Sequence, residues 1–428
     1  MNHKLYGLAD CNNFFVSCER VFRPDLQDKP VIVLSNNDGC AISRSQEAKD
    51  LGIKMGQPLF EIQPLVDKYN VAIFSSNFAL YGNMSNRVMS MLSHYTPLLE
   101  QYSIDEAFID LNNMCRTNEQ YHDYGVEIVQ TVRRATGIPI SLGIAPTRTL
   151  AKMASKYAKK YKGYKGACLI NTDEAREKAL RLFPIEDVFG IGRRHVKRLN
   201  QAGVRTAWDF TQLSAEWVRN QMTITGLRTW QELQGIDCIR LDELPMKKSI
   251  TCSRSFADHG LTDLNSLEGS IATFAADVAR KLRRQRSLCT HMLVFAHTSL
   301  FVDSQSQNFI QLQIQFPQPT ADTLQITDAA VQALRRAWVN RNFHYKKAGI
   351  VVWNIVSDKN FQTDLFDERD IMKINKLWKT IDQINSRTGS PVVKTAVQGK
   401  QQREMMAQNH RSPEYTTNWN ELWTISAG

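Results

Sequence analysis

The sequence has 428 residues, more than one hydrophobic core usually supports, so we expect roughly two to four domains. A hydrophobic fraction of 43% and a charged fraction of 22% are typical of a globular protein and exclude a disordered chain. The formal net charge of +10 indicates a polyanionic partner, either nucleic acid or an anionic membrane surface.

The cysteines and the N-terminus bear on the cellular compartment. The 8 cysteines are scattered singly and none forms a C-x-x-C pair, which argues against a zinc site and against a disulfide framework. The first residues, MNHKLYGLADCNNFF, lack a basic run followed by a long apolar stretch, so we expect no signal peptide. No apolar stretch approaches the length of a membrane span. These features predict a cytoplasmic protein in a reducing compartment.

The first 166 residues alternate short apolar runs with amphipathic segments. Strands are expected at 4–10, 30–34, 71–76 and 138–146, and helices at 14–22, 45–52, 77–95 and 121–137. Asp38-Gly39 is a hairpin turn signal, with a return strand after it. The order β-α-β-β-α-β-β, with helices on one side, predicts an α+β sheet domain ending near residue 166.

The pattern changes after this domain. Residues 183–244 show short helices interrupted by glycine, and ELPMKKSI (243–250) reads as a polar linker. Residues 249–355 alternate amphipathic helices with strands, which predicts a second α+β unit. After Asp358 the sequence is polar and weakly patterned, so we expect a flexible tail.

Two adjacent carboxylates interrupt the apolar strand QYSIDEAFIDL. They are Asp105 and Glu106, and Asp10 ends the first strand. If the two strands are neighbours, the three carboxylates converge at one edge of the sheet and raise one another's pKa unless a cation neutralises them. Two Mg²⁺ ions would accept these oxygens, with the Cys11 carbonyl as a further ligand, and could stabilise an in-line phosphoryl displacement. Spacing alone leaves open a solvent-exposed acidic turn.

Several motifs in order resemble the Y family of translesion DNA polymerases, and in particular its UmuC type. They are LADCNNFF, VIVLSNNDGCAISRSQEAKDLGIKMGQP, YSIDEAFID and LGIAPTRTLAKMASKYAKK, and the resemblance covers nearly the whole chain. It implies an α+β right-hand polymerase in which Asp10, Asp105 and Glu106 are catalytic and hold two Mg²⁺ ions. The implied domains are a palm (1–20 and 76–166), fingers (21–75), a helical thumb (167–244), a little finger (245–357) and a C-terminal tail (358–428).

The resemblance also implies a nucleotide pocket. Phe15 stands where the family carries an aromatic steric gate, whose flat ring leaves no room for a 2′-hydroxyl. A buried core position is the other interpretation, although the adjacent Phe14 suits the core better. The implied contacts to the incoming nucleotide are Ile42, Ser43, Lys49 and Lys159, of which the cations would offset charge that spreads over the phosphates.

Two basic regions predict contacts to DNA. Arg148–Lys165 carries 7 Lys and Arg residues and no acid, and Lys152 lies toward the palm on this helix. The segment PIEDVFGIGRRHVKRL resembles a helix-hairpin-helix, whose turn amides bind a backbone phosphate without reading bases. An ordinary turn remains the alternative for this segment. The DNA-binding residues predicted are Lys152, Gly190, Gly192, Arg193 and Arg284.

The C-terminal region carries a possible docking peptide. FQTDLFD resembles the peptide by which bacterial polymerases bind the β sliding clamp, with Gln362, Leu365 and Phe366 as its contacts. Trp419 and Trp423 lie four residues apart and either pack on the chain's own domains or bind a partner. The resemblance further implies a UmuD′-like dimer and a RecA filament as partners, without assigning residues to them.

The resulting hypothesis is an error-prone DNA polymerase that inserts deoxynucleotides opposite damaged bases in the SOS response. Small fingers of roughly 55 residues would check base-pair shape weakly. A DNA-binding accessory protein with a dead palm is the main alternative, but it would have lost one of the three carboxylates, and all are present. A nucleotide cyclase, a second alternative, has no use for a helix-hairpin-helix or a clamp peptide.

Overall fold

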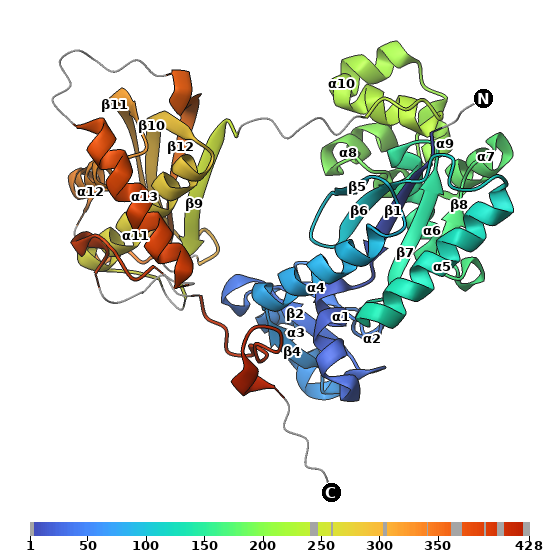
Figure 1. The fold of residues 1–428 in the computed structure, drawn as a ribbon, viewed down its shortest axis with the longest axis horizontal. Helices are drawn as coiled ribbons and strands as arrows, with labels where there is room; N and C mark the ends of the chain where they lie inside the picture. The colour runs from blue at the N-terminus through green and yellow to red at the C-terminus, as the bar shows by residue number, and fades with distance from the viewer. Residues whose placement is uncertain are drawn as a thin grey trace, which may run out of the picture. The chain divides into compact units, whose positions relative to one another are not determined.

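The chain divides into two compact units (Figure 1). The computed structural model describes residues 4–239, 247–257, 260–302, 306–339, 341–360, 370–388, 391–399 and 406–422. The first unit comprises Met1–Leu241 together with Gln408–Gly428, and the second comprises Asp242–Ala407. The second unit is therefore an insertion between two stretches of the first.

The first unit is built on a five-stranded sheet in the order β5-β6-β1-β7-β8. The central strand β1 pairs antiparallel with β6 and with β7, whereas β7 and β8 are parallel. The strands are β1 (Tyr6–Cys11), β5 (Leu99–Gln101), β6 (Glu106–Asp110), β7 (Ile140–Ala145) and β8 (Ala167–Leu169). The predicted neighbourhood of the first strand and the carboxylate strand is confirmed.

Helices cover both faces of this sheet, so the expectation of helices on one side is wrong. Ala9 packs into a core with α4 and α5, whereas the adjacent Leu8 packs against α6. Successive side chains of a strand point to opposite faces, and here both faces are apolar because both are covered. The helices are α1 (Phe14–Phe22), α4 (Phe78–Leu92), α5 (Asn118–Thr136) and α6 (Arg148–Lys160).

A smaller three-stranded sheet in the order β3-β2-β4 has its own core around Ile32, Leu34 and Ile62. The predicted hairpin is present, with a single 3₁₀ turn at Asn36–Asp38 between its antiparallel strands. The elements are β2 (Val31–Leu34), β3 (Ala41–Arg44), α2 (Gln46–Asp50), α3 (Leu59–Tyr69) and β4 (Ala72–Ser75). Helix α1 packs against β2, β3 and α4, so it joins the two sheets (Figure 1).

A group of helices follows β8 and shares the core of α6. Phe183, Phe210 and Met222 are buried in this core. The helices are α7 (Asp173–Leu182), α8 (Arg193–Gln201), α9 (Ala207–Thr211) and α10 (Ala215–Leu233), with a 3₁₀ turn at Ile185–Asp187. The turn stands where the first helix of the predicted helix-hairpin-helix would lie, so this part of the motif is shorter than expected.

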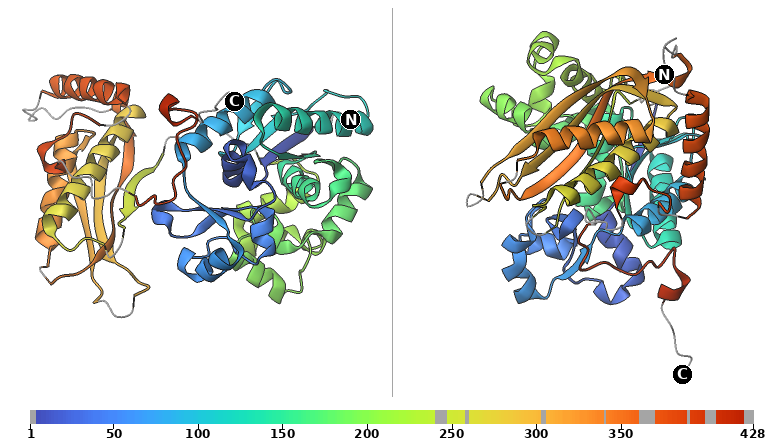
Figure 2. Two further views of the ribbon diagram at one scale, coloured as in Figure 1. Left: turned by 90° about the horizontal axis from the view of Figure 1, so that it is seen from below. Right: turned by 90° about the vertical axis from the view of Figure 1, so that its left-hand side faces the viewer.

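The second unit is an antiparallel sheet in the order β11-β10-β12-β9 with two helices packed on it (Figure 2). The elements are β9 (Ser249–Ser255), α11 (Leu264–Arg284), β10 (Ser287–Thr298), β11 (Phe309–Thr320), α12 (Thr323–Ala337) and β12 (Tyr345–Ser357). This confirms the expected second α+β unit.

A further helix corrects the expectation of a flexible tail after Asp358. It is α13 (Ile371–Arg387), which begins beyond the predicted clamp peptide. Arg283 of α11 makes a bidentate ion pair with Asp382 (2.7 and 2.8 Å), and Trp378 is buried and donates to Asp322. The clamp peptide itself, with Gln362, Leu365 and Phe366, lies outside the described residues, as does Trp423.

The chain then returns to the first unit. At the end of β4, the backbone N–H of Ser75 donates to the carbonyl of His410, and the backbone N–H of His410 donates to the Ser75 hydroxyl. The ring of Tyr415 is buried and stacks on Phe22 with centroids 4.6 Å apart. Trp419, in contrast, is 87% exposed. No helix within the described residues is both long and apolar enough to cross a bilayer.

Glu19 is a buried carboxyl beneath this returning segment, and it predicts a pH dependence of stability. Burial raises its pKa to about 7, although hydrogen bonds from Tyr81 and Ser412 and the charge of Arg23 act in the opposite direction. The folded state therefore holds a proton that the unfolded chain releases, so stability is full below the unfolded pKa and falls as pH rises toward 7. The loss from this group is about 3 kcal/mol.

The Glu19→Gln variant mimics the neutral acid at every pH. It should match the wild type in urea unfolding near pH 5 and exceed it by up to about 3 kcal/mol near pH 8. Glu61→Gln, an exposed position on α3, is the matched control and should show no such divergence. Parallel pH profiles of the Glu19→Gln variant and the wild type would contradict the prediction.

Candidate active site

Asp10 and Glu106 face each other across the central strand pair. They are directly opposed in the β1–β6 register, which places their side chains on the same face of the sheet. Both residues lie at the end of the pair, where the polar groups meet solvent, and their side chains are 29% and 15% exposed. The two carboxylates that the sequence separates by almost 100 residues are thus brought together.

Asp105 lies in the bend that precedes β6. Its carbonyl oxygen accepts a hydrogen bond from the backbone N–H of Cys11 (2.9 Å). The hydroxyl of Ser103 donates to Asp105 Oδ1 and accepts from the backbone N–H groups of Asp105 and Glu106. Ser103 therefore fixes both the turn and the orientation of the carboxylate.

Two lysines of α6 compensate the acidic cluster. Lys159 Nζ lies 3.3 Å from Asp10 Oδ1, and Lys152 Nζ lies 3.2 Å from Glu106 Oε2. Burial raises the pKa of Glu106; Lys152 lowers it, and the charges of Asp10 and Asp105 raise it further. Asp10 and Asp105 thus act on Glu106 at close range, and such a concentration of negative charge favours a cation.

The donor chemistry of this cluster suits Mg²⁺, a hard cation that takes carboxylate and carbonyl oxygens. Within the described residues, no three Asp, Glu, His or Cys side chains are arranged around one point as a preformed metal site. The ammonium groups of Lys152 and Lys159 bond to the oxygens that such ions would use. Asp10, Asp105 and Glu106 have the oxygen ligands that Mg²⁺ prefers and lie close together, so these residues fit a magnesium site.

Phe15 lies at the start of α1 and presents a half-exposed ring. The neighbouring Phe14 is buried, as expected of the core residue of this pair. The Phe15 ring stacks on Tyr81 of α4, with centroids 4.5 Å apart and planes 14° apart, and meets Phe78 edge-on. Tyr81 is fully buried, so the partly exposed ring of Phe15 rests on a buried one.

The residues predicted to contact the nucleotide come from three elements: Ile42 and Ser43 lie on β3, Lys49 lies on α2, and Lys159 lies on α6. Lys49 of α2 donates to Asn13 Oδ1 (2.6 Å). Burial lowers the pKa of Lys49, and the charge of Lys159 lowers it further, whereas the charge of Asp10 raises it. Lys49 therefore lies close enough to Lys159 and Asp10 to feel the charge of both. Ser43 is buried, and its hydroxyl accepts from the backbone N–H of Val16 (3.4 Å). Ile42, the next residue back on β3, is half-buried.

Lys152 also joins the carboxylates to the helices that follow the sheet. Its ammonium lies 4.2 Å from the ring centroid of Phe189 and 4.5 Å from that of Tyr102. Gly190 follows with φ +85°, and a Cβ there would lie 2.8 Å from Thr229 Oγ1, so the turn requires glycine. Gly192 caps α8 with no side chain, and Arg193 is exposed at the first position of that helix.

Several basic residues of the second unit are held in ion pairs within that unit. Arg283 is bound to Asp382, Arg280 to Asp277, and Arg335 makes a bidentate pair with Glu268. The predicted DNA contact Arg284, in contrast, is exposed near the end of α11. Several arginines of the second unit therefore form ion pairs that stabilise its own fold.

Sequence reasoning missed Ser103, Tyr81 and Glu19. Leu80, Tyr81 and Met84 are buried on α4, but a helical period in the sequence does not say which ring on another helix a tyrosine will meet. Glu19 carried a weak signal, because an acid within the apolar run FFVSCERVF is unusual for a buried helix face.

Comparisons with known proteins match most of the chain. A family model described as the impB/mucB/samB family matches residues 9–156, and its C-terminal domain matches residues 247–365. A third model, described only as a domain of unknown function, matches residues 375–425.

Relatives match at full length. The chain is 39% identical to the protein UmuC of Salmonella typhimurium strain LT2 over 98% of this chain and 100% of the relative. It is 35% identical to MucB of Escherichia coli over 98% and 99%. A more distant relative, DNA polymerase IV 1 of Halalkalibacterium halodurans, is 27% identical over 90% of this chain and 91% of the relative.

A solved structure supports the fold. A Y-family DNA polymerase chimera of Dbh and Dpo4 aligns with a TM-score of 0.63 and 20% identity, covering 82% of this chain and 99% of that one. At this identity the likeness concerns the fold, which is the α+β multidomain architecture expected from the sequence.

Proposed function

Because the chain belongs to the impB/mucB/samB family of UmuC-type, Y-family DNA polymerases, we propose that it transfers deoxynucleotides at a two-metal site formed by Asp10, Asp105 and Glu106. The chain is a DNA-directed DNA polymerase that acts in translesion synthesis, within the SOS response and DNA repair. The observation that carries the catalytic assignment is the opposition of Asp10 and Glu106 across β1 and β6, with Asp105 in the adjoining bend.

The test is primer extension by the full chain on a template with an abasic site, in Mg²⁺ and in excess chelator. We expect extension past the abasic site in Mg²⁺ and none in chelator. Binding of primer-template without extension under every condition would favour the accessory-protein alternative. That outcome would overturn the proposal.

The chain's own residues define what happens at this site. Asp10, Asp105, Glu106 and the Cys11 carbonyl would hold two Mg²⁺ ions, which when bound supply charge stabilisation to the reacting oxygens. Lys159 and Lys49 would balance the negative charge that spreads over the phosphates. Ser43 and Ile42 would contact the nucleotide from β3. Ser103 keeps the Asp105 carboxylate oriented throughout.

Phe15 would exclude ribonucleotides, since a ring beneath the sugar leaves no space for a 2′-hydroxyl. The Phe15→Ala variant should lower the preference for dNTP over rNTP, measured as the ratio of kcat/KM values, by roughly 100-fold. Phe60→Ala, an exposed phenylalanine on α3, is the matched control and should keep the wild-type ratio. Unchanged selection in the Phe15→Ala variant would exclude the gate.

We assign the DNA contacts to Lys152, Gly190, Gly192 and Arg193 in the first unit and to Arg284 in the second. The free N-terminus of α8, with Gly192 as cap and Arg193 exposed, supports phosphate binding. The corresponding domains are the palm (1–20 and 76–166), fingers (21–75), thumb (167–244), little finger (245–357) and tail (358–428). Among the described residues of this tail are helix α13 and the segment 406–422.

The β sliding clamp would bind the peptide of Gln362, Leu365 and Phe366. Replacing Leu365 and Phe366 with Ala should abolish stimulation of synthesis by the clamp and leave distributive synthesis unchanged, because the apolar pair would fill the clamp's pocket. Processivity on a long template, with and without clamp, measures this. Stimulation that survives the double substitution would exclude this docking site. The UmuD′-like dimer and the RecA filament are the other partners proposed.

A further inference from the structure

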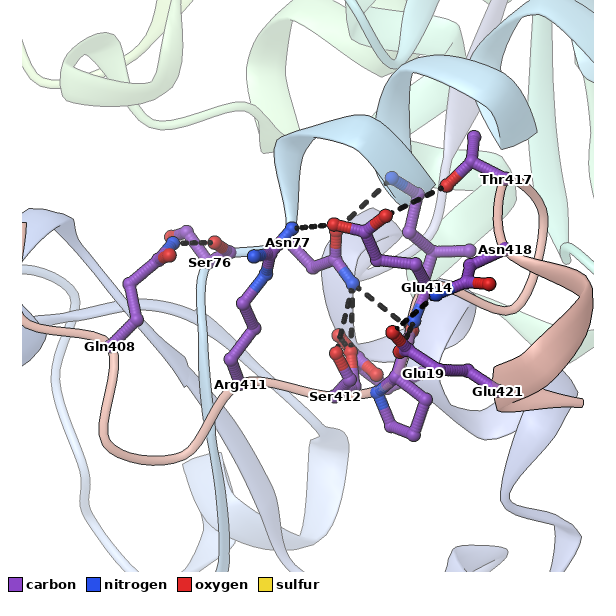
Figure 3. A network of polar contacts seen from close by, with 12 residues as sticks. Glu19, Ser76, Asn77, Gln408, Arg411, Ser412, Glu414, Thr417, Asn418 and Glu421 are labelled. Carbon is purple, nitrogen blue, oxygen red and sulfur yellow. Dashed lines mark hydrogen bonds and ion pairs between the residues drawn. The ribbon is translucent and has the colours of Figure 1, made fainter. Parts of the chain in front are cut away.

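The C-terminal strap, residues 408–418, is bound to the first unit by its backbone and by buried side chains (Figure 3). Gln408 donates to the carbonyl of Ser76, and the backbone N–H of Asn409 donates to Asp38 Oδ2 (2.8 Å). Ser412, a few residues further along the strap, is 5% exposed. The strap thus follows the joint between the small sheet and α4.

Asn77 ties the strap to the beginning of α4. It is 1% exposed, and its Oδ1 caps the helix by accepting from the N–H of Leu80. Its Nδ2 donates to the hydroxyl and carbonyl of Ser412 and to the carbonyl of Pro413, at 3.1 to 3.3 Å (Figure 3). The first turn of α4 and the strap are therefore held by one side chain.

Glu19 joins the strap to both helices. Its Oε1 accepts from the Ser412 hydroxyl (3.0 Å) and from the Tyr81 hydroxyl (2.7 Å). The carboxyl is fully buried, so each of these donors satisfies a group that has no access to water. Loss of the Ser412 hydroxyl removes one of these two donors and holds the carboxyl less firmly, and the Tyr81 hydroxyl is bonded to that same oxygen.

Phe15 and Glu19 are four residues apart on α1 and lie on the same side of the helix. The Tyr81 side chain spans this interval: its hydroxyl bonds to Glu19, and its ring stacks on Phe15 at 4.5 Å. The position of the Phe15 ring therefore depends on where Tyr81 is held. Ser412, at the other side of the same carboxyl oxygen, contributes to that placement.

We propose that the C-terminal strap is a positioning element of the nucleotide pocket, in which Ser412 acts through Glu19 and Tyr81 to hold the Phe15 ring and so sharpens discrimination against ribonucleotides. The inference rests on the proposed function of Phe15 as the sugar gate. It gives a role to a segment that lies within the match to a family model described as a domain of unknown function.

The experiment is single-nucleotide insertion by the full chain, with the dNTP and rNTP ratio of kcat/KM as the readout. The Ser412→Ala and Tyr81→Phe variants should each lower this ratio by about tenfold, mainly through a lower KM for rNTP, and leave kcat for dNTP within about twofold. Partial unfolding lowers kcat for both nucleotides equally and leaves the ratio unchanged, so a merely structural role gives a different result. Tyr81→Phe probes the same carboxyl oxygen if Ser412→Ala does not fold.

The Phe15→Ala variant separates the two levels of the hypothesis. In that background Ser412→Ala should have no further effect, because no gate remains to be positioned. The exposed strap position Thr417, replaced with Ala, is the matched control and should keep the wild-type ratio. If Phe15→Ala loses selection while Ser412→Ala and Tyr81→Phe keep it, the strap inference is wrong and the gate stands. If Phe15→Ala keeps selection, the gate fails and the inference fails with it.

Discussion

The Asp105→Ala variant should lose template-directed primer extension by at least about 10³-fold. The carboxylate lies in the bend before β6, is oriented by Ser103, and is close enough to Glu106 to raise its pKa. Removing it takes away one of the three acidic groups proposed to hold the cations, and the two that remain, Asp10 and Glu106, are each already paired with a lysine of α6. The alanine exposes no new apolar surface, so the fold should survive, and the loss should appear in kcat with DNA affinity kept.

The control for this variant is Asp123→Ala, a carboxylate on α5 with a side chain that is 76% exposed. It removes the same charge from the same unit and should extend primers at the wild-type rate. Equal extension by the Asp105→Ala variant and the wild type would contradict the catalytic assignment. A loss of primer-template binding that parallels the loss of extension would indicate a role in DNA contact instead.

The clustering of the three carboxylates was predictable because its signal is local. Two adjacent acids within an apolar strand, and a third at the end of another, are anomalies that the amino-acid pattern exposes, and the strand pairing then follows from topology. Phe15 was identified only through resemblance to a family. The two layers of helices on the sheet were missed, although the mainly apolar character of β1 and β7 is the pattern of strands buried on both faces.

The strap and its partners were not predictable, and the reason is physical. Ser412 and Glu19 are almost 400 residues apart. Ser412 stands in a polar stretch with no unusual pattern, and the acid within FFVSCERVF does not indicate which distant residue it will meet. The second unit is inserted between them in the sequence. Neither periodicity nor composition indicates where the chain packs when it returns to the first unit. Buried polar pairs of this kind are visible only when the packing around them is known.

Gly143, on β7, is where α6 comes closest to the sheet. A Cβ at this position would overlap the carbonyl oxygen of Ala151 and the backbone nitrogen of Ser155, both on α6. These are backbone atoms within a helix, so no side-chain rotation relieves the overlap. The helix could make room only by moving away from the sheet as a whole.

The Gly143→Ala variant should therefore lose at least about 3 kcal/mol of stability, measured by urea or thermal unfolding of the full chain. The molecules that stay folded should also be poor polymerases, because α6 carries Lys152 and Lys159, and their ammonium groups lie 3.2 to 3.3 Å from Glu106 and Asp10. Gly82→Ala is the matched control: it lies inside α4, where an added Cβ would have no atom within 4 Å apart from its chain neighbours and the backbone of its own helix, and it should gain about 0.5–1 kcal/mol. A Gly143→Ala protein with wild-type stability would mean that α6 does not pack this closely, and the placement of both lysines at the carboxylates would then lose its support.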